Sequence, residues 1–327
     1  MKAIQFDEYG GPDVLHEVET EIPTPKKQEV LIEIHAIGVN YADTARRRGQ
    51  YVVPTPLPFI PGAEVAGVIS DVGEGVTRFK AGDRIVTLMN DGGYAEYAVA
   101  DERSVIPIHD TLDFETAVAL PLQGLSAYHV LKTMGRLSDG ETVLVHAAAG
   151  GVGGIAVQLA QLMGAGKVIA TASTEEKLSY AKELGAGVLV DYTKEDWEKE
   201  VLEATNGKGV DVALEMVGGD VFKKTLSCLG TFGRLVIFGS ASGEASQLNA
   251  GQLMARNQSV IGFFLPQMMR KPHLMKSSLE ELFGYLQAGD LKLQIGETFL
   301  LEEAAHVHSI MEGRQTKGKL VLTPRKS

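Results

Sequence analysis

The chain contains very little cysteine and few aromatic residues. Among its 327 residues there is one cysteine, Cys228, and one tryptophan, and aromatic residues make up 6%. A single cysteine excludes an internal disulfide and any zinc site built from several thiolates. The N-terminal segment also lacks the apolar core of a secretion signal. Both features are typical of a reducing compartment, so we expect a cytoplasmic protein.

An excess of basic charge is missing as well. The formal net charge is −11 and the pI is about 5.3, and a surface of that sign repels nucleic-acid phosphates. The run Arg46-Arg47-Arg48 is a candidate for a local basic patch, although such short runs are usually solvated. Nucleic acid is therefore an unexpected partner. The hydrophobic fraction of 44% fits a globular protein of about two domains.

Formal charge is absent from Thr142 to Gly166. A run of this length suggests a membrane helix. Glycines interrupt it, however, and it carries His146, Gln158 and Gln161. A buried parallel strand followed by its helix explains the same apolarity, so we expect no membrane segment.

The same stretch predicts a strand (142–146), a glycine-rich turn (147–154), a helix (155–164) and a second strand (167–171). A diphosphate can sit on the N–H groups of a helix N-terminus only where no side chain blocks the backbone. Gly150 permits that approach, and Gly153 lets the helix lie close to the strand. The first position of the usual G-x-G-x-x-G pattern is Ala148, which is tolerable if its φ stays negative. The context predicts a dinucleotide site.

The end of the second strand indicates which dinucleotide binds. An NAD site usually has Asp or Glu there, to hold the ribose 2′-hydroxyl, but the segment Ala170 to Thr174 has no carboxylate. Ser173, Thr174 and Lys177 instead suit a 2′-phosphate, as short donors and one point charge. Ser173 or Thr174 can equally cap the helix from Glu175 to Leu184. We expect NADPH.

Hydrophobic periodicity divides the chain into a β-rich part and an α/β part. Short apolar runs at 30–37, 64–73, 82–88 and 93–99 predict a small barrel, with an irregular loop from Pro54 to Pro61. A helix from 120 to 131 leads into six strands, the number in a complete dinucleotide fold, at 142–146, 167–171, 187–190, 210–215, 233–238 and 259–264. We therefore expect domains at 1–122 and 123–264, with 265–327 returning to the first domain because it has no core of its own.

Five segments resemble the zinc-free NADPH:quinone oxidoreductases of the medium-chain dehydrogenase/reductase superfamily. They are Ala36–Asp43, Pro61–Gly67, Gly82–Ile85, His146–Gly153 and Thr316–Leu322. The resemblance implies an α/β protein with a GroES-like β-barrel catalytic domain and a Rossmann domain with a doubly wound, six-stranded parallel sheet. It implies hydride transfer from NADPH to a quinone or an α,β-unsaturated carbonyl.

The zinc-dependent branch places a cysteine ligand where this chain has Asn40 and a histidine ligand where it has Ala63. The four cysteines of its structural-zinc lobe are also missing between Asp91 and Asp101. No metal is therefore expected. A reduction without zinc is easiest when the product charge is delocalised, as in a phenolate or enolate.

The resemblance also implies site residues. Asn40 and Tyr51 would line the nicotinamide pocket, with Tyr51 orienting the substrate or donating a proton, although a tyrosine beside a proline-rich loop often only packs. The implied cofactor contacts are Gln123, Gly150, Gly151, Val152, Gly153, Ser173, Thr174, Lys177, Tyr192, Gly218, Phe238, Gly239 and Ser240. Gln123 is equally well explained as a helix N-terminal side chain, and Tyr192 as a half-buried strand-end residue. Relatives pair the last strand of the nucleotide sheet across a two-fold, which implies a homodimer through Ser259 to Phe264.

Two alternative functions remain open. An enoyl-thioester reductase shares this scaffold, and a basic cluster of Arg270, Lys271, His273 and Lys276 would suit a phosphate-bearing carrier. The second alternative is an NADPH-binding protein with a structural or RNA-binding role, which the acidic composition disfavours.

Overall fold

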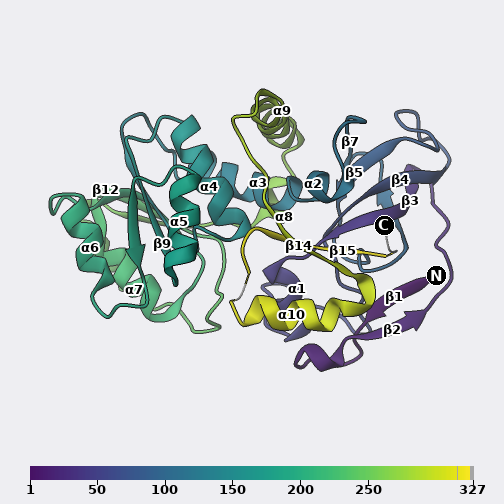
Figure 1. Cartoon of the computed structure of the whole chain (residues 1–327), viewed down its shortest axis with the longest axis horizontal. Helices are drawn as coiled ribbons and strands as arrows, with labels where there is room; N and C mark the ends of the chain where they lie inside the picture. Colours follow the sequence, from purple (N-terminus) through teal and green to yellow (C-terminus); the bar gives the residue numbers. More distant parts are fainter. Residues whose placement is uncertain (315, 325–327) are drawn as a thin grey trace. The chain divides into compact units, whose positions relative to one another are not determined.

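The computed structural model describes residues 1–314 and 316–324, and the chain forms two compact units (Figure 1). Unit 1 comprises Met1–Leu122 and the chain from Leu293 onward, and unit 2 is Gln123–Lys292. Residues 265–292 were expected to return to the first domain with the rest of the C-terminal segment. They lie in unit 2 instead, so the returning segment begins at Leu293.

Unit 1 is organised around a seven-stranded sheet in the order β14-β15-β3-β4-β5-β7, with β6 paired to β3. The strands are β3 (Glu29–Gly38), β4 (Glu64–Val72), β5 (Arg84–Leu88), β6 (Tyr97–Asp101), β7 (Val105–Pro107), β14 (Ile295–Leu300) and β15 (Lys319–Thr323). Alternate side chains enter the core, including Ile32 and Ile34 on β3 and Leu320 and Leu322 on β15. β15 pairs antiparallel with β3, so the end of the chain completes the core of unit 1.

Smaller elements surround this sheet. They are β1 (Lys2–Gln5), η1 (Pro12–Val14), β2 (His16–Glu19), α1 (Tyr41–Arg47), α2 (Phe114–Val118), η4 (Leu301–Glu303) and α10 (Ala304–Glu312). The strand expected at 93–99 begins only at Tyr97. The preceding residues pair with the N-terminal strand instead: Ile4 N–H donates to the Tyr94 carbonyl at 2.8 Å, and Ala3 bridges Ala95.

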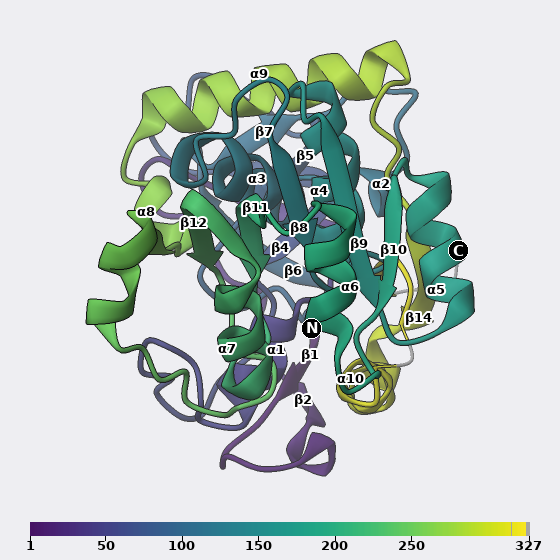
Figure 2. The ribbon, with the colours of Figure 1, turned by 90° about the vertical axis from the view of Figure 1, so that its left-hand side faces the viewer.

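Unit 2 contains the predicted six-stranded parallel sheet, in the order β10-β9-β8-β11-β12-β13; Figure 2 shows its strands side by side from β12 to β10. The strands are β8 (Thr142–Val145), β9 (Lys167–Ala172), β10 (Val188–Asp191), β11 (Val210–Glu215), β12 (Leu229–Ile237) and β13 (Ser259–Gly262), and the connecting helices are α4 (Gly151–Leu162), α5 (Glu175–Glu183), α6 (Trp197–Ala204) and α7 (Gly219–Ser227). The chain runs outward from β8 to β10, then crosses back to β11 and runs outward the other way. The doubly wound prediction is confirmed, and its switch point lies between β8 and β11.

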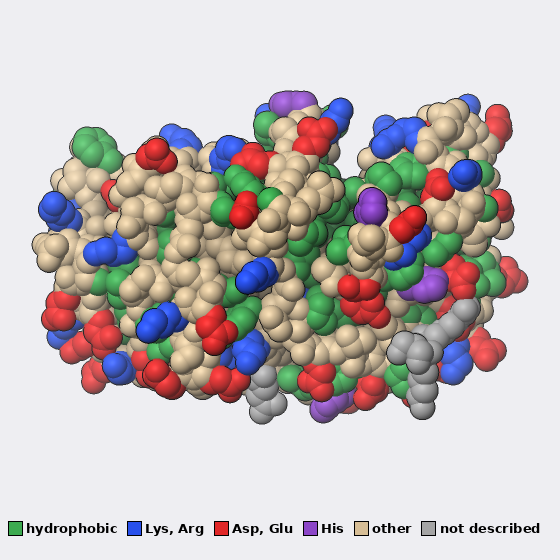
Figure 3. All heavy atoms as spheres, turned by 45° about the horizontal axis from the view of Figure 1, so that its top comes forward, with side chains coloured by type: hydrophobic (Ala, Val, Ile, Leu, Met, Phe, Trp, Pro, Cys, Tyr) green, Lys and Arg blue, Asp and Glu red, His purple; other side chains and the backbone are tan. Residues whose placement is uncertain are grey.

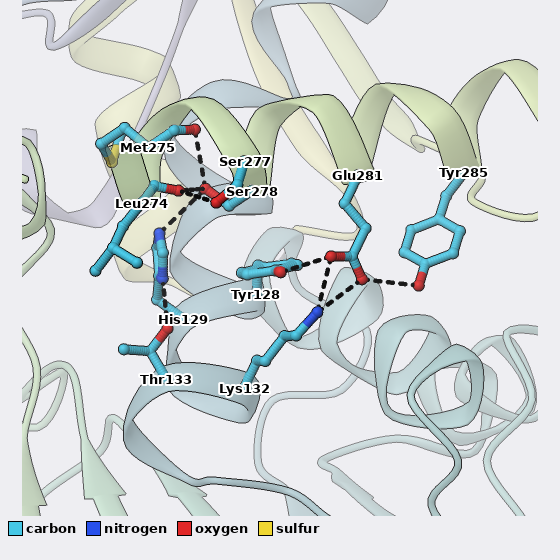
Figure 4. Close-up of polar contacts among 10 residues, drawn as sticks. All are labelled: Tyr128, His129, Lys132, Thr133, Leu274, Met275, Ser277, Ser278, Glu281 and Tyr285. Atoms are coloured by element: carbon cyan, nitrogen blue, oxygen red, sulfur yellow. Dashed lines mark hydrogen bonds and ion pairs between the residues drawn. The ribbon is translucent and has the colours of Figure 1, made fainter. Parts of the chain in front are cut away.

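The remaining elements of unit 2 explain why residues 265–292 belong to it. They are α3 (Pro121–Tyr128), which starts at the unit boundary, the π-helix η2 (His129–Met134), η3 (Ala250–Arg256), α8 (Leu265–Met268) and α9 (Pro272–Ala288). Figure 4 shows Glu281 of α9 accepting hydrogen bonds from Tyr128 at 2.7 Å and Tyr285 at 3.0 Å and pairing with Lys132 at 2.8 Å. The helix expected at 120–131 is therefore observed as α3, which presents Tyr128 to α9, followed by the π turns of η2, which present Lys132.

The core of unit 2 contains a neutral histidine. His146 lies at the end of β8, between the hydroxyls of Thr171 (Nδ1, 2.8 Å) and Thr225 (Nε2, 2.7 Å), and it meets the Trp197 ring edge-on. Thr225 already donates to the Val221 carbonyl, so its oxygen accepts from Nε2–H, and Nδ1 accepts from Thr171. Burial lowers the pKa of His146 to about 4.

This histidine makes unit 2 sensitive to acid. An unfolded histidine binds a proton below its ordinary pKa of 6.5, but His146 in the folded chain resists protonation down to about pH 4. Stability should therefore fall as the pH is lowered through this window, by up to about 1.4 kcal/mol per pH unit for one histidine. His146→Gln should flatten the dependence, whereas His273→Gln, at an exposed position of α9, should leave it unchanged. Urea unfolding followed by the fluorescence of Trp197, the only tryptophan, measures both; equal slopes for all three proteins would contradict the assignment.

Candidate functional site

The loop after β8 gives α4 an N-terminus without a side-chain cap. Gly150 is its N-cap, with φ −83°, and it has no side chain with which to cap the helix. A Cβ on Gly153 would lie 2.2 Å from the Ala147 carbonyl oxygen, so only glycine lets the first turn pack on the loop. Ala147 takes the positive φ of 48°, while Ala148 stays outside the left-handed region. The first N–H groups of α4 consequently remain available to an anion.

Gln123 lies against the first turn of α4. A Cβ on Gly151 would come within 2.0 Å of the Gln123 Oε1, so the two residues are in direct contact. Gln123 is buried in the first turns of α3, and Val152 beside Gly151 is partly buried. The structure thus brings Gln123 to the glycine loop, although it also occupies the helix-start position that the alternative interpretation gave it.

Ser173, Thr174 and Lys177 follow the end of β9, next to the glycine loop in the sheet. Thr174 caps α5, since its hydroxyl accepts the Lys177 N–H at 3.3 Å. It is exposed, while Ser173 and Lys177 are half-buried. No carboxylate stands at the tip of β9, and the first acids, Glu175 and Glu176, lie in the first turn of α5.

The turns after β11 and β12 are joined by backbone hydrogen bonds. Phe238 N–H donates to the Glu215 carbonyl at 3.0 Å, and Ala241 N–H to the Met216 carbonyl at 2.8 Å. Gly218 has φ 85°, which favours glycine, and a Cβ there would lie 2.9 Å from the Glu244 carbonyl oxygen. A Cβ on Gly239 would lie 3.1 Å from Met216, and Ser240 follows Gly239. The structure therefore brings Gly218, Phe238, Gly239 and Ser240 together.

Glu215 organises these turns, and sequence reasoning missed it. It is fully buried at the end of β11, where its Oε1 accepts the N–H groups of Val217 (2.7 Å) and Gly218 (3.0 Å). Its Oε2 is buried and has no hydrogen-bond partner among the described residues. Burial raises the pKa of this carboxyl. A carboxylate directly after the apolar run Val212-Ala213-Leu214 was the available signal.

Parallel strands place all these groups at one edge of the sheet. The glycine loop, Ser173 and Gly218 follow β8, β9 and β11, which are neighbours, and Phe238 follows the next strand, β12. Tyr192 follows β10 at the same edge; its N–H donates to the Ala172 carbonyl at 3.2 Å, and its ring packs partly buried against the core. Ligands of doubly wound sheets bind outside the carboxyl ends of the strands, at the switch point.

In unit 1, Asn40 belongs to a buried polar cluster with Glu64 and Lys319. Its amide nitrogen donates to Glu64 Oε1 at 2.9 Å and to the Gly38 carbonyl at 3.1 Å, and its oxygen accepts from Lys319 Nζ at 2.8 Å. Lys319 also pairs directly with Glu64, whose other oxygen accepts the Leu122 N–H at 3.0 Å. Both amide protons of Asn40 are therefore used, and one lone pair of its oxygen remains for a ligand.

Tyr51 is half-buried beneath an arginine of α1. The Arg46 guanidinium carbon lies 4.3 Å from the centroid of the Tyr51 ring. Burial raises the pKa of the Tyr51 phenol, so the hydroxyl is protonated at neutral pH. The neighbouring side chains Val52 and Val53 are exposed and apolar. The geometry thus presents a protonated phenol beside an apolar loop.

The run Arg46-Arg47-Arg48 is not a basic patch. Arg47 is fully buried; it ion-pairs with Glu312 of α10 and hydrogen-bonds His308 Nδ1 at 3.2 Å, and Arg48 joins Glu312 at 3.1 Å. Burial lowers the pKa of His308 to about 3. The guanidinium groups of Arg47 and Arg48 therefore hold α1 to α10, and only the guanidinium of Arg46 makes its contacts elsewhere.

The donor set does not suit a metal. Asn40 and Ala63 stand where the zinc-dependent branch has two ligands, and the amide of Asn40 already binds Lys319. Within 1–314 and 316–324, no group of three or more His, Cys, Asp or Glu side chains is placed to hold a metal ion.

Comparison with known proteins decides the family. Residues 26–110 match the alcohol dehydrogenase GroES-like domain, and residues 151–282 match the zinc-binding dehydrogenase domain. A quinone oxidoreductase of Pseudomonas aeruginosa is 39% identical over 325 residues, covering 99% of each chain. The chain belongs to the zinc-free quinone oxidoreductases of the medium-chain dehydrogenase/reductase superfamily. The predicted combination of a GroES-like barrel and a Rossmann domain is confirmed with it.

Other relatives of this chain extend the comparison. The crystal structure of Escherichia coli quinone oxidoreductase complexed with NADPH superposes with a TM-score of 0.94 at 35% identity, covering 99% of this chain and all of that one. A 2-haloacrylate reductase of a Burkholderia species is 36% identical over 97% of both chains.

The Asn40 cluster should dominate the stability of unit 1 in this family member. Lys319→Met leaves Glu64 buried without its cation and should cost about 3–5 kcal/mol. Adding Glu64→Gln removes the orphaned charge, so the double variant should be more stable than Lys319→Met alone. Calorimetric unfolding of the two single variants and the double variant measures the coupling. Additive losses would show that the two charges do not stabilise each other.

Proposed function

We propose that this chain is an NADPH-dependent, zinc-independent oxidoreductase that reduces quinones or α,β-unsaturated carbonyl compounds. The observation that carries the proposal is the carboxyl edge of the unit 2 sheet, where an uncapped helix N-terminus lies beside a strand tip without a carboxylate. The similarity to an NADPH-complexed quinone oxidoreductase and to a 2-haloacrylate reductase supports both the cofactor and the acceptors.

The residues of unit 2 fit this dinucleotide. The amides of Gly150 to Gly153 would bind the diphosphate, because the glycines leave the backbone open there. Ser173, Thr174 and Lys177 would bind the 2′-phosphate, and Tyr192 would contact the adenosine side. Gln123 and the joined turns carrying Gly218, Phe238, Gly239 and Ser240 would contact the nicotinamide side.

Bound NADPH would supply a hydride, so that a quinone gains two electrons and one hydrogen from the cofactor and one proton from the protein or solvent. The negative charge formed on the acceptor oxygen is delocalised and needs hydrogen bonds rather than a metal. Tyr51 suits this role, because its phenol is protonated and half-buried. Asn40 would not donate to this oxygen, because both its amide protons are used; its Oδ1 would accept a hydrogen bond from the cofactor or substrate, or the residue would position the loop through its Glu64 and Lys319 contacts.

An enoyl-thioester reductase is the alternative within enzymes. The cluster that would favour it is exposed in the structure: Lys271, His273 and Lys276 lie at or near the start of α9, with Lys276 weakly paired to Glu280 at 3.8 Å. Turnover of a small quinone and of crotonyl-CoA, followed by loss of reduced nicotinamide absorbance, separates the two functions. Reaction of the thioester alone would replace the quinone assignment.

A purely binding role is disfavoured. Figure 3 shows acidic and basic side chains interspersed on the displayed face, and Arg47 of the candidate basic run is buried. NADPH binding without oxidation across a broad panel of acceptors would favour it.

Among the described residues, no helix combines the length and apolarity needed to cross a bilayer.

We also propose a homodimer and a cytoplasmic location. β13 ends the order of the unit 2 sheet, and a terminal strand offers unpaired backbone groups to a second copy. Its side chains are mostly half-buried. For the location, the single thiol Cys228 is buried, and burial raises its pKa to about 12, so it is not a disulfide-forming group. Sedimentation analysis tests the dimer.

The coenzyme preference should depend on the tip of β9. Lys177→Ala removes a charge from the 2′-phosphate site and should weaken NADPH binding about tenfold, with little effect on NADH. Ser173→Asp should weaken NADPH further and improve NADH, because it restores the missing acid. Lys182→Ala, on the last turn of α5, is the matched control and should change neither. Fluorescence titration gives the dissociation constants; tighter NADH than NADPH binding by the unaltered chain would contradict the assignment.

Tyr51 should act mainly on the proton-dependent step. Tyr51→Phe keeps the ring under Arg46 but removes the hydroxyl, so kcat for an enone should fall about 10- to 100-fold. The kcat for a quinone, whose product charge is spread over an aromatic ring, should fall less. Steady-state kinetics on one acceptor of each kind provides the comparison. Unchanged kcat on both would assign Tyr51 to packing.

A further inference from the structure

Arg46 holds an ordered guanidinium beside Tyr51. Its guanidinium carbon lies 4.3 Å from the Tyr51 ring centroid and 5.2 Å from that of Phe59. One nitrogen donates to the hydroxyl of Thr55 at 3.3 Å, and Thr55 is itself buried and anchored by Tyr9, whose hydroxyl donates to its carbonyl at 2.6 Å. Two aromatic faces and one hydrogen bond therefore fix the direction of this cation.

Among the described residues, the same cation has no ion-pair partner. No carboxylate lies within 4.0 Å of Arg46 among residues 1–314 and 316–324, whereas Arg47 and Arg48 share Glu312. The side chain is half-buried, and its guanidinium contacts with Tyr51, Phe59 and the Thr55 hydroxyl involve no group that is negative at neutral pH. A guanidinium has five N–H donors in a fork that matches a carboxylate. The arrangement is a preorganised half of a bidentate ion pair.

An α,β-unsaturated carboxylate is the acceptor that needs such a group. Hydride addition to a neutral enone gives a singly charged enolate. Addition to the β-carbon of a 2-alkenoate places a second negative charge on a group that already carries one. Without a metal, a guanidinium paired with both carboxylate oxygens is the means of neutralising that charge.

We propose that Arg46 binds the carboxylate of α,β-unsaturated acids and makes them substrates of this chain. The inference rests on the proposed function. In the reaction the β-carbon gains the hydride of NADPH, the α-carbon gains a proton, and the C=C π bond is lost: 2-alkenoate, NADPH and H⁺ give the saturated carboxylate and NADP⁺. Arg46 is a specificity-determining residue here, since neutral acceptors do not require its charge.

The test compares acid and neutral forms of one acceptor. 2-Chloroacrylate and its methyl ester are assayed with Arg46→Met, Arg46→Lys and the control Arg48→Met, which removes the same charge two residues away. The kcat/KM ratio of acid to ester should fall about tenfold or more in Arg46→Met, recover partly in Arg46→Lys, and stay unchanged in Arg48→Met. Calorimetric titration with 2-chloropropionate, the saturated acid, should show a matching rise in Kd without any turnover.

Each outcome decides the proposal. An unchanged ratio and Kd in Arg46→Met overturn it, as does a loss confined to crotonyl-CoA, which would assign the guanidinium to a phosphate. If Arg46→Met unfolds, as judged by its thermal melt, Arg46→Lys carries the comparison. An undiminished kcat/KM ratio of acid to ester in Arg46→Lys, in which the cation stacks more weakly on the rings, then also counts against the proposal. Absence of NADPH oxidation with every acceptor defeats the proposed function itself. Quinone reduction, together with an acid-to-ester kcat/KM ratio that Arg46→Met leaves unchanged, defeats this inference alone.

Discussion

The candidate cofactor site depends on one close backbone approach, that of Gly153 to the Ala147 carbonyl. A methyl group at Gly153 would sit 2.2 Å from that oxygen, so any side chain there would push α4 away from the loop after β8. With glycine, the helix starts directly at the edge where the strands end, and Gly150 leaves its first amides uncovered. The turn after β11 lies at the same edge of the sheet, because parallel pairing sets β11 beside β8. Moving α4 outward would separate the diphosphate position from Gly218.

The described buried polar residues of unit 1 hydrogen-bond one another and do not form a metal site. Asn40, Glu64 and Lys319 neutralise and hydrogen-bond one another in full burial, so they fix β3, β4 and β15 together and contribute little free donor capacity. Electrophilic assistance must then come from other groups. Tyr51 and Arg46 are the candidates in this unit: a protonated phenol and a cation without a carboxylate partner among the described residues. The acceptor range of a metal-free reductase follows from what these two can stabilise.

Local patterns predicted the parallel sheet, the glycine loop and the barrel strands, because periodicity and turn residues act over a few positions. They could not predict effects of distant partners. The strand expected at 93 starts at Tyr97 because Tyr94 is taken by β1, and α9 joins unit 2 because Glu281 finds Tyr128 and Lys132. Likewise, three adjacent arginines look alike in sequence, but Glu312, more than 260 positions away, buries Arg47 and leaves Arg46 to the rings. The roles of the individual site residues stay predictions.

The proposed preference for a phosphorylated ribose has two opposing parts. Glu175 and Glu176 stabilise the first turn of α5 through the helix dipole, but they also place negative charge near the proposed phosphate site. Lys177 and the capped N-terminus of α5 oppose that repulsion with about one unit charge and a partial one. The net attraction for phosphate is therefore modest. Discrimination against NADH consequently comes mostly from what β9 lacks, since no carboxylate at its tip accepts the ribose hydroxyl. The part of the selectivity that comes from exposed charges should weaken as salt screens them. The part that comes from the absent carboxylate at the tip of β9 should not depend on ionic strength.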